Sequence, residues 1–452
     1  MLKINSKKSR KGHTNKPFWL LTGLVLISLV GCNSLPFDVS LPWTLPWINS
    51  TQQPESSPQT ETSQPVQPTE DFADATSTPV PTPEKLVVWL PPELNPEGDD
   101  QAAALLQSRL DAFSKSQGLE IQVRIKNLSG TGGLLDALTV TNAAAPAALP
   151  DLIVLNQKDM ETAALKSLIY PLDSLTTIVD GEDWFPYSRN LGLIQNVVYG
   201  IPFVGDPLTL VYDSTLNPAP LPDWTSVAAN AGRLALAIDD PQASYTLTLY
   251  LSLGGQVEDN QRHPMLEVEP LTEALQLLKD ANIAGRITLT SLQYQDKDQV
   301  WEAFDKGQAD MVVVPVSRVL QALKQDRTGL PQPALSETPN SIATGWVLAV
   351  TTSQPERQKL AVALAEDLVK PDFLAGWTEA LGRLPARPSA LDAWQDLQLK
   401  PRLSIISSEA VVYPSNEVMT SVAPVLRNAT LLILRDNADP SETAKQAVES
   451  LQ

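Results

Sequence analysis

The residue types most often used for covalent and metal chemistry are scarce in this 452-residue chain. It has one cysteine, Cys32, and two histidines, His13 and His263. Cys/His zinc sites, Ser-His-Asp triads and Cys-His dyads are disfavoured because each needs more of these residues. The Gly-rich segment Ser129–Gly133 lacks the lysine of a phosphate-binding loop, so we interpret it as a turn before a helix. Sites built from carboxylates alone remain open.

Cys32 lies at the end of a short, largely apolar stretch near the N-terminus. Residues 18–30 have about the length of the hydrophobic region of a signal peptide and are too few for a typical membrane-spanning helix. Only basic charges precede them. The pair Gly31-Cys32 resembles the lipobox of bacterial lipoproteins, which implies a signal peptide over 1–31 and lipidation of Cys32. The alternative is a single-pass anchor with an incidental cysteine, and both hypotheses place the following chain outside the cytoplasm.

The chain is acidic, with 33 Lys and Arg residues against 52 Asp and Glu residues. Six of the basic residues lie in the predicted signal peptide, which leaves 27 against 52. This charge disfavours nucleic acids and anionic membrane surfaces as partners, since both need basic patches. No disulfide can form after Cys32, so the hydrophobic core alone must stabilise the fold.

Residues 32–84 are predicted to form a lipid-anchored, disordered tether. From Ser50 to Glu84 the chain consists mostly of Pro, Thr, Ser, Gln and Glu. Such a segment buries too little apolar surface to offset the entropy of ordering it. The tether is therefore expected to hold the folded part away from the membrane.

Strands and helices are predicted to alternate from Lys85 onward. Leu86–Leu90 is an apolar run of the strand type, and Asp99-Asp100 is a capping signal for a helix through about Lys115. This order predicts a parallel sheet with helices on its faces, and ligands of such sheets bind beyond the carboxyl ends of the strands. The loops expected at that edge are 91–98, 127–133 and 156–159. Further strands are predicted at 119–125, 151–155, 207–212, 233–238, 310–314 and 346–351, and further helices at 134–145, 160–168, 271–281, 300–306, 315–324, 355–369, 371–381 and 415–434.

Five short motifs follow one another over about 240 residues. They are Leu149–Val154 followed by Leu168 and Pro171-Leu172, Tyr199-Gly200-Ile201-Pro202-Phe203 with Leu210-Val211-Tyr212-Asp213 after it, Trp301–Met311, Gly345–Val350 and Arg383-Leu384-Pro385-Ala386-Arg387. In this order they resemble the extracellular solute-binding proteins of ABC importers, in the maltose-binding-protein-like group. The resemblance covers roughly residues 85–452.

The resemblance implies an α/β fold of the two-lobe, periplasmic-binding-protein-like type (type II), with a ligand cleft between lobes joined by chain crossovers. One lobe is expected to comprise residues 85–203 and 350–405, and the other residues 204–349 and 406–452. The protein is expected to be a monomer without a cofactor or enzymatic activity. It would capture a small polar solute, most simply a sugar or oligosaccharide, by lobe closure and deliver it to an ABC permease.

The resemblance also implies which residues contact the solute. Asp206 follows the first crossover at an acidic contact position, Trp346 lies at the second crossover, and Tyr245 is near a cleft aromatic of the family. Carboxylates there can accept sugar hydroxyls or hold a cation, and a tryptophan ring can stack on a sugar face. The alternatives are solvated loop acids and ordinary core packing. The full predicted set is Asn156, Asp159, Asp206, Tyr245, Ser317, Arg318 and Trp346.

One departure from the family weakens the carbohydrate prediction. Val316-Ser317-Arg318 stands where the family often has an aromatic residue, and Arg318 is at a helix start, where anions also bind. Two other functions stay open at this point. One is a surface glycoside hydrolase that uses paired carboxylates, and the other is a scaffolding lipoprotein with a non-binding cleft.

Overall fold

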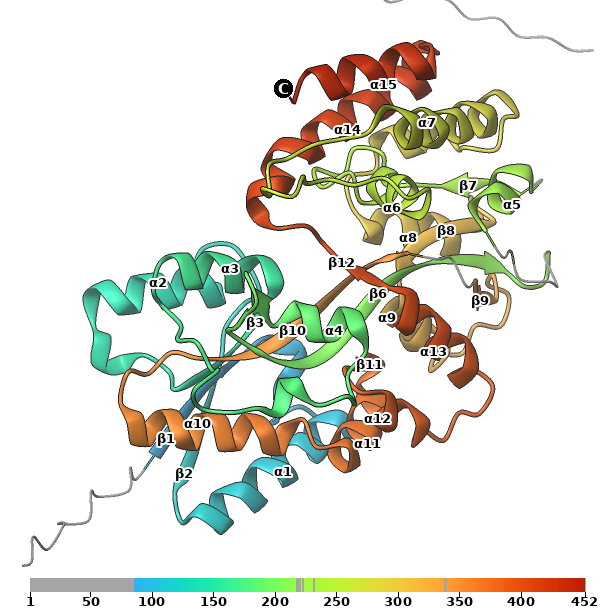
Figure 1. Ribbon diagram of the computed structural model, residues 1–452. Coiled ribbons are helices and arrows are strands. Elements are labelled where there is room, and N and C mark those ends of the chain that lie inside the picture. Colours follow the sequence, from blue (N-terminus) through green and yellow to red (C-terminus); the bar gives the residue numbers. More distant parts are fainter. Residues whose placement is uncertain (1–84, 217–220, 222, 231, 337–339, 452) are drawn as a thin grey trace, which may run out of the picture. The chain divides into compact units, whose positions relative to one another are not determined.

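The computed structural model describes residues 85–216, 221, 223–230, 232–336 and 340–451 (Figure 1). The predicted signal peptide, Cys32 and the tether lie outside the described residues. The described chain is a mixed α/β structure built on a ten-stranded sheet whose central order is β2-β1-β3-β10-β6-β8-β7.

The first three strands pair in parallel, as predicted. Strand β1 pairs in parallel with β2 on one side and with β3 on the other. Asp100 caps the first helix, since its carboxylate accepts a hydrogen bond of 2.7 Å from the amide of Ala103. The elements are β1 (Lys85–Leu90), α1 (Gln101–Gln117), β2 (Glu120–Ile125), α2 (Leu134–Ala144), β3 (Leu152–Asn156) and α3 (Gln157–Leu165).

Two long strands, β6 (Ile201–Asp213) and β10 (Ile342–Val350), cross the middle of the sheet. They pair with each other in antiparallel fashion. The later half of β10 pairs with β3, and the later half of β6 pairs with β8 (Met311–Pro315). Strand β6 begins six residues before the predicted strand at 207, because the chain stays extended through the crossover, where all of its residues are buried.

A pair of glycines lies in the register between the two crossover strands. Gly205 lies opposite Gly345 in the register. A Cβ atom on Gly345 would lie 2.4 Å from the carbonyl oxygen of Val204, and one on Gly205 would lie 1.7 Å from the Tyr187 hydroxyl. Both positions therefore need glycine. The register shifts next to this pair, between Trp346 and Val347.

Several short strands complete the sheet. The strand predicted at 233–238 is only two residues long, because the chain turns away from β8 after its parallel pairing. A separate hairpin precedes β6. The short strands are β4 (Leu193–Ile194), β5 (Val197–Val198), β7 (Leu234–Ala235), β9 (Pro333–Leu335), β11 (Leu384–Pro385) and β12 (Val411–Val412).

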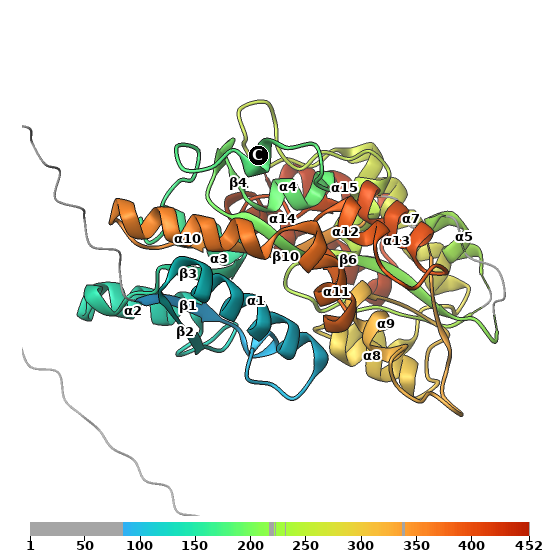
Figure 2. The same cartoon turned by 90° about the horizontal axis from the view of Figure 1, so that it is seen from below.

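Helices cover the sheet, and α1 lies beside α10 and α11 (Figures 1 and 2). Several of the helices were not predicted, among them α6, α13 and α15. The helices are α4 (Pro186–Leu191), α5 (Trp224–Ala229), α6 (Ser244–Ser252), α7 (Val268–Ile283), α8 (Lys297–Asp305), α9 (Val316–Ala322), α10 (Pro355–Leu368), α11 (Pro371–Leu381), α12 (Pro388–Asp392), α13 (Lys400–Glu409), α14 (Asn416–Asp436) and α15 (Pro440–Glu449), with 3-10 turns at Pro92–Leu94, Pro146–Ala148, Ile178–Asp180 and Leu289–Gln293.

Buried hydrophobic side chains form two cores. The first surrounds β1 and β3 and includes α10 to α13, and it also takes in Phe304 of α8 and Leu320 of α9. The second is formed mainly by α6, α7, α14 and α15. The predicted change of lobe at residue 406 falls inside α13, whose Leu403 and Ile406 both pack in the first core. This packing favours a change of lobe after α13, and the lobe boundaries remain a proposal.

Helix α14 is long and apolar enough to span a membrane by length and composition. Its apolar residues Val418, Val422 and Leu426 are nevertheless buried in the second core, beside α7 and α15 (Figure 1). A core helix of a folded domain has this composition too, and this packing accounts for it.

Candidate functional site

A cavity of about 530 Å³ opens between α3, β10 and α14. We call it the cleft. The predicted loop at 156–159 contributes to it, because β3 ends at Asn156, whereas the loops at 91–98 and 127–133 do not line it. Its lining consists of Asn156, Gln157, Lys158, Glu161, Pro241, Gln242, Thr344, Gly345, Trp346, Arg383, Tyr413, Pro414, Asn416, Met419, Thr420, Ala423 and Pro424.

Asn156 and Asp159, both predicted to contact the solute, cap α3 together. The Asn156 side-chain oxygen accepts a hydrogen bond of 2.8 Å from the Asp159 amide, and its Nδ2 donates to the Asp159 carboxylate at 2.9 Å. The Asn156 side chain therefore caps the helix by accepting from the amide of its third residue, and it also holds the Asp159 carboxylate. Burial raises the pKa of Asp159, and this effect outweighs the bond from Asn156 and the nearby Lys158. Asn156 lines the cleft and Asp159 does not.

Trp346 lies in the wall of the cleft under an arginine. It is the cross-strand neighbour of Asn156 and is 6% exposed. The guanidinium carbon of Arg383 lies 4.3 Å from the centre of the indole ring, a cation–π contact. Two hypotheses were open for Trp346, a stacking platform for the solute and ordinary core packing. The residue borders the cleft, as a platform would, but one face of its ring is covered by Arg383 and it is largely buried.

Asp206 lies behind Arg383 and is buried. Its Oδ2 accepts hydrogen bonds from Arg383 Nη1 at 2.8 Å and from the Ser317 hydroxyl at 2.7 Å, and its Oδ1 accepts one from the Ser317 amide at 2.9 Å. Neither Asp206 nor Ser317 lines the cleft. The anion at the start of α9 is thus the chain's own Asp206. Its observed role is to hold Arg383, which does reach the cleft.

Two further predicted contacts lie away from the cleft. Arg318 forms an ion pair with Asp298 of α8. Tyr245 packs edge-on against Trp224, with ring centres 5.4 Å apart and an interplanar angle of 89°. Burial raises the pKa of the Tyr245 hydroxyl. The structure therefore brings Asn156 and Trp346 together at the cleft, and Asp206 joins them only through Arg383.

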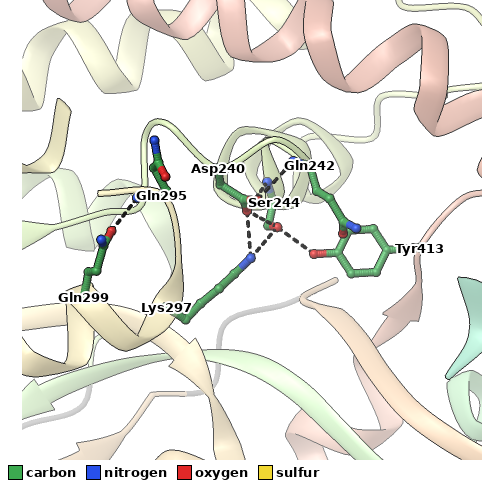
Figure 3. A network of polar contacts seen from close by, with 7 residues as sticks. All are labelled: Asp240, Gln242, Ser244, Gln295, Lys297, Gln299 and Tyr413. Carbon is green, nitrogen blue, oxygen red and sulfur yellow. Dashed lines mark hydrogen bonds and ion pairs between the residues drawn. The ribbon is translucent and has the colours of Figure 1, made fainter. Parts of the chain in front are cut away.

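Tyr413 supplies an aromatic ring to the cleft that was not predicted. It follows β12, and a polar network holds its hydroxyl (Figure 3). That hydroxyl donates to the Ser244 Oγ at 2.6 Å, and the Lys297 ammonium donates to the same oxygen at 2.8 Å and to Asp240 at 2.7 Å. The Ser244 hydroxyl donates to Asp240. The network joins α6, α8 and the segment before α14.

The charges in this network are balanced. Burial opposes ionisation of both Asp240 and Lys297, but their mutual attraction and hydrogen bonds outweigh it. The pKa of Asp240 is therefore lowered and the pKa of Lys297 raised, while burial raises the pKa of Tyr413. Tyr413 accordingly stays a neutral donor and its ring has one fixed position. Asp240 also accepts a bond of 3.0 Å from the amide of Gln242, whose side chain lines the cleft.

Helix α3 contacts the start of α14 along one side of the cleft. The Glu161 carboxylate accepts a hydrogen bond of 2.7 Å from the Asn416 amide, the first residue of α14. Asn416 Nδ2 donates to the Lys158 carbonyl at 2.9 Å, and Gln157 donates to the Tyr413 carbonyl at 3.1 Å. Burial raises the pKa of Glu161, and this effect exceeds that of the Asn416 bond.

A family comparison decides the identity of the chain. The family model of the bacterial extracellular solute-binding proteins matches residues 108–401, which is well over half of the chain. The chain belongs to this family. The resemblance predicted from the five motifs is thereby confirmed, and the family consists of binding proteins.

Solved structures with the fold of this solute-binding protein include several sugar-binding proteins. The cyclic α-maltosyl-1,6-maltose binding protein of Arthrobacter globiformis has a TM-score of 0.66 at 16% identity, with 82% of this chain and 98% of that chain covered. The maltose-binding protein MalE of Listeria monocytogenes, in complex with maltose, has a TM-score of 0.65 at 14% identity, with 81% and 97% covered.

The GacH receptor of Streptomyces glaucescens, known unliganded and with acarbose, has a TM-score of 0.60 at 19% identity, with 81% and 97% covered. At these identities the likeness concerns the fold, and it confirms the two-lobe α/β architecture. A comparison with curated protein sequences finds no match.

The chemistry open to this solute-binding protein follows from its lining. Glu161 is the only carboxylate among the described residues that line the cleft. Within the described part of the chain, no group of three or more His, Cys, Asp or Glu side chains is placed to hold a metal ion. The lining instead offers amides, one arginine, one lysine and two aromatic rings. This set suits recognition of a neutral polar molecule by hydrogen bonds and ring contacts.

Two lining residues had a signal that sequence reasoning passed over. Arg383 is the first residue of the motif Arg383–Arg387, which was used only as a mark of the family. Gly382, with a φ of 73°, ends α11, and β11 pairs with β6, so Arg383 is held between two fixed points. Tyr413 precedes the helix signal Pro414-Ser415. Tyr413 could have been found by looking for aromatic residues that lie just before a predicted helix.

Proposed function

We propose that this solute-binding protein captures a sugar or oligosaccharide in the cleft and delivers it to an ABC permease from an anchored position outside the cytoplasm. The observation that carries the proposal is the lining itself. Trp346 with Arg383, and Tyr413 held by its network, present rings beside the amides of Asn156, Gln157 and Gln242. Rings that face apolar sugar surfaces and amides that bind hydroxyls are the groups such a ligand needs.

The structural relatives support a saccharide. The Listeria monocytogenes protein was solved with maltose and the Streptomyces glaucescens receptor with acarbose. In the present chain Asp206 would act on such a ligand through Arg383 rather than from the wall of the cleft. Closure would be a hinge motion at β6 and β10, with the lobe boundaries near the predicted ones.

Hydrolysis is the less favoured function for this cleft. A glycoside hydrolase uses two carboxyl groups that flank the bond. The described lining provides Glu161 alone, and its carboxylate is bonded to the Asn416 amide. We therefore propose capture without chemistry.

Calorimetric titration of the full chain in detergent with maltose, maltotetraose, acarbose and an amino-acid mixture tests the function. We expect saturable binding of at least one sugar with no product formed. Trp346→Ala is expected to weaken that binding by at least tenfold, because the mutation removes a ring and the support of Arg383. Trp301→Ala, a half-buried tryptophan outside the cleft, is the matched control. A folded protein that binds none of the sugars would favour a scaffolding role, and release of shorter sugars from maltotetraose would favour a hydrolase.

Anchoring through Cys32 is a separate proposal, motivated by the sequence alone. We expect Cys32→Ser to abolish lipid attachment, because a serine cannot form the thioether. Metabolic labelling with a radioactive fatty acid, followed by fractionation, measures this. Label that persists on the serine variant would contradict the lipoprotein hypothesis.

A further inference from the structure

Helix α14 contains a proline in its interior, Pro424, and this residue lies on the cleft. In an α-helix the N–H of residue 424 would donate to the carbonyl oxygen of Thr420. Proline has no N–H, and its ring pushes against that carbonyl. The Thr420 carbonyl therefore lacks the amide donor that residue 424 supplies in a regular helix.

The freed carbonyl lies at the wall of the cleft. Thr420 and Pro424 are four residues apart, so they share one helix face, and both are exposed and line the cleft. The opposite face, with Val418, Val422 and Leu426, is buried in the second core. Helix carbonyls point toward the C-terminus of the helix, so the oxygen of Thr420 points toward Pro424 along the cleft face.

The Thr420 side chain adds to the acceptor character of this wall. Its hydroxyl donates to the Asn416 carbonyl at 2.7 Å, so its proton is used within the helix. What remains toward the cleft is the hydroxyl lone pairs and the free carbonyl. Elsewhere the lining has donors, namely the guanidinium of Arg383 and the ammonium of Lys158. The cleft thus has hydrogen-bond acceptors on the α14 side, at Thr420, and hydrogen-bond donors elsewhere, at Arg383 and Lys158.

We propose that Pro424 creates a binding subsite in which the Thr420 carbonyl oxygen accepts a hydrogen bond from a hydroxyl group of the bound solute. This inference rests on the proposed function, and it adds which side of the bound solute must donate a hydrogen bond. The solute turns a hydroxyl toward α14, where a carboxylate would meet only acceptors. The subsite depends on the missing N–H of residue 424 and not on the side chain of that residue.

The test restores the N–H in two ways. Pro424→Ala and Pro424→Val both supply an amide that binds the Thr420 carbonyl, and the valine keeps the apolar bulk. We expect both variants of the full chain to bind maltose or acarbose roughly three- to tenfold more weakly, the effect of one lost hydrogen bond. Their melting temperatures are expected to rise, because an interior proline is the least favourable helix residue. A general structural disturbance would lower stability together with affinity.

Pro355→Ala is the matched control. Pro355 is also exposed, but it is the first residue of α10, where the N–H of a regular helix has no carbonyl partner. Its affinity for the sugars is expected to equal that of the parent. Hydrogen exchange of the Pro424→Ala variant provides a readout without solute, and the new amide at position 424 is expected to be protected.

The outcomes separate the inference from the proposed function. A parent protein that binds neither sugar overturns both. A parent that binds, with unchanged affinity in Pro424→Ala and Pro424→Val, overturns the inference and leaves the proposed function standing. Weaker binding in the alanine variant alone would assign the effect to the proline ring and would also overturn it, as would an unprotected amide at position 424.

Discussion

Asp206 and Arg383 form an ion pair that is nearly removed from solvent, with side-chain exposures of 8% and 16%. Asp206 has further partners in Ser317, whereas Arg383 borders the cleft and covers Trp346. One buried carboxylate thus positions the guanidinium that a solute would meet. Removing either member leaves the other charge without its counterion.

Arg383→Met is therefore expected to lower the free energy of unfolding by about 3 kcal/mol, since it leaves a buried, unpaired carboxylate. Adding Asp206→Asn to the same chain is expected to restore a large part of that loss. Urea denaturation of the two single variants and the double variant gives the coupling energy. Strictly additive losses would show that the two residues do not act as a pair. Each single variant is also expected to weaken sugar binding.

Tyr413→Phe tests the network behind the cleft. The variant loses the bond from the hydroxyl to Ser244 but keeps the ring, so we expect a stability loss of about 1 kcal/mol. Sugar affinity is expected to change little in Tyr413→Phe and to fall clearly in Tyr413→Ala. Urea midpoints and calorimetry measure the two effects. Equal affinities in both variants would mean that the ring does not contact the solute.

At this scale the sequence predicted positions better than orientations. Asn156 and Trp346 line the cleft because strand ends and crossovers border it, and their contact with the solute stays a prediction. Asp206 follows the same crossover, but its direction depends on Ser317 and Arg383, which are 111 and 177 residues away. A pattern of neighbouring residues in the sequence cannot predict partners that are so far apart along the chain. Tyr413 was missed for the same reason, since its hydroxyl is bonded to Ser244, 169 residues earlier.

The crossover strands β6 and β10 are the elements on which the site depends. Gly205 and Gly345 let them approach, and Asp206 and Trp346 come directly after these glycines. The close approach thus sets the positions of both the buried carboxylate and the indole. A side chain at Gly345 would have to displace the backbone of β6, and one at Gly205 would have to displace the Tyr187 ring.

Gly345→Ala is expected to destabilise the protein by more than 2 kcal/mol, because the new methyl group would lie 2.4 Å from the backbone oxygen of Val204. Gly376→Ala is the control. This exposed glycine of α11 has no atom within 4 Å of an added Cβ, so alanine is expected to stabilise the helix by about 0.5–1 kcal/mol. Thermal unfolding of both variants measures the difference. A tolerated Gly345→Ala would show that the crossover is adaptable.

The periodicity of the sequence predicted most of the long helices and the first three strands within a few residues. It did not predict α6, whose sequence Ser-Tyr-Thr-Leu-Thr-Leu-Tyr-Leu-Ser alternates and is rich in strand-forming residues. Burial on nearly all sides overrides that local preference. The early part of β6 was not predicted as a strand because Pro202 argues against one, and yet this proline is accommodated there.

The stability of the whole molecule is expected to depend on pH through Asp240 and Lys297. The lowered pKa of Asp240 contributes stability that is present above about pH 4 and is lost as the pH falls through its folded value. The raised pKa of Lys297 contributes stability that is present below about pH 10 and is lost as the pH rises through its folded value.

The double variant Asp240→Asn/Lys297→Met removes both charges and is the comparison. The difference in unfolding free energy between parent and variant is expected to be constant from about pH 5 to 9 and to shrink on both sides. Urea denaturation across this range measures it. A difference that stays constant down to about pH 2 would show that Asp240 is not held as a carboxylate by its partners.

The order of the motifs predicted the family and the two-lobe fold, because motifs in sequence follow the path of the chain. The sequence could not show that the first core also takes in α8 and α9, since Phe304 and Leu320 look like ordinary buried residues. The lobe boundaries were for the same reason harder to predict than the lobes.

The hydrogen bonds between β6 and β10 have a mechanical consequence. Two connecting segments without hydrogen bonds between them would bend independently and would allow the lobes to rotate in many directions. Two strands bonded side by side form a ribbon, which is stiff against bending within its own plane and compliant in torsion and in bending across its face. The lobes are then restricted to a narrow set of rotations, so an encounter with solute does not need a search over many relative orientations.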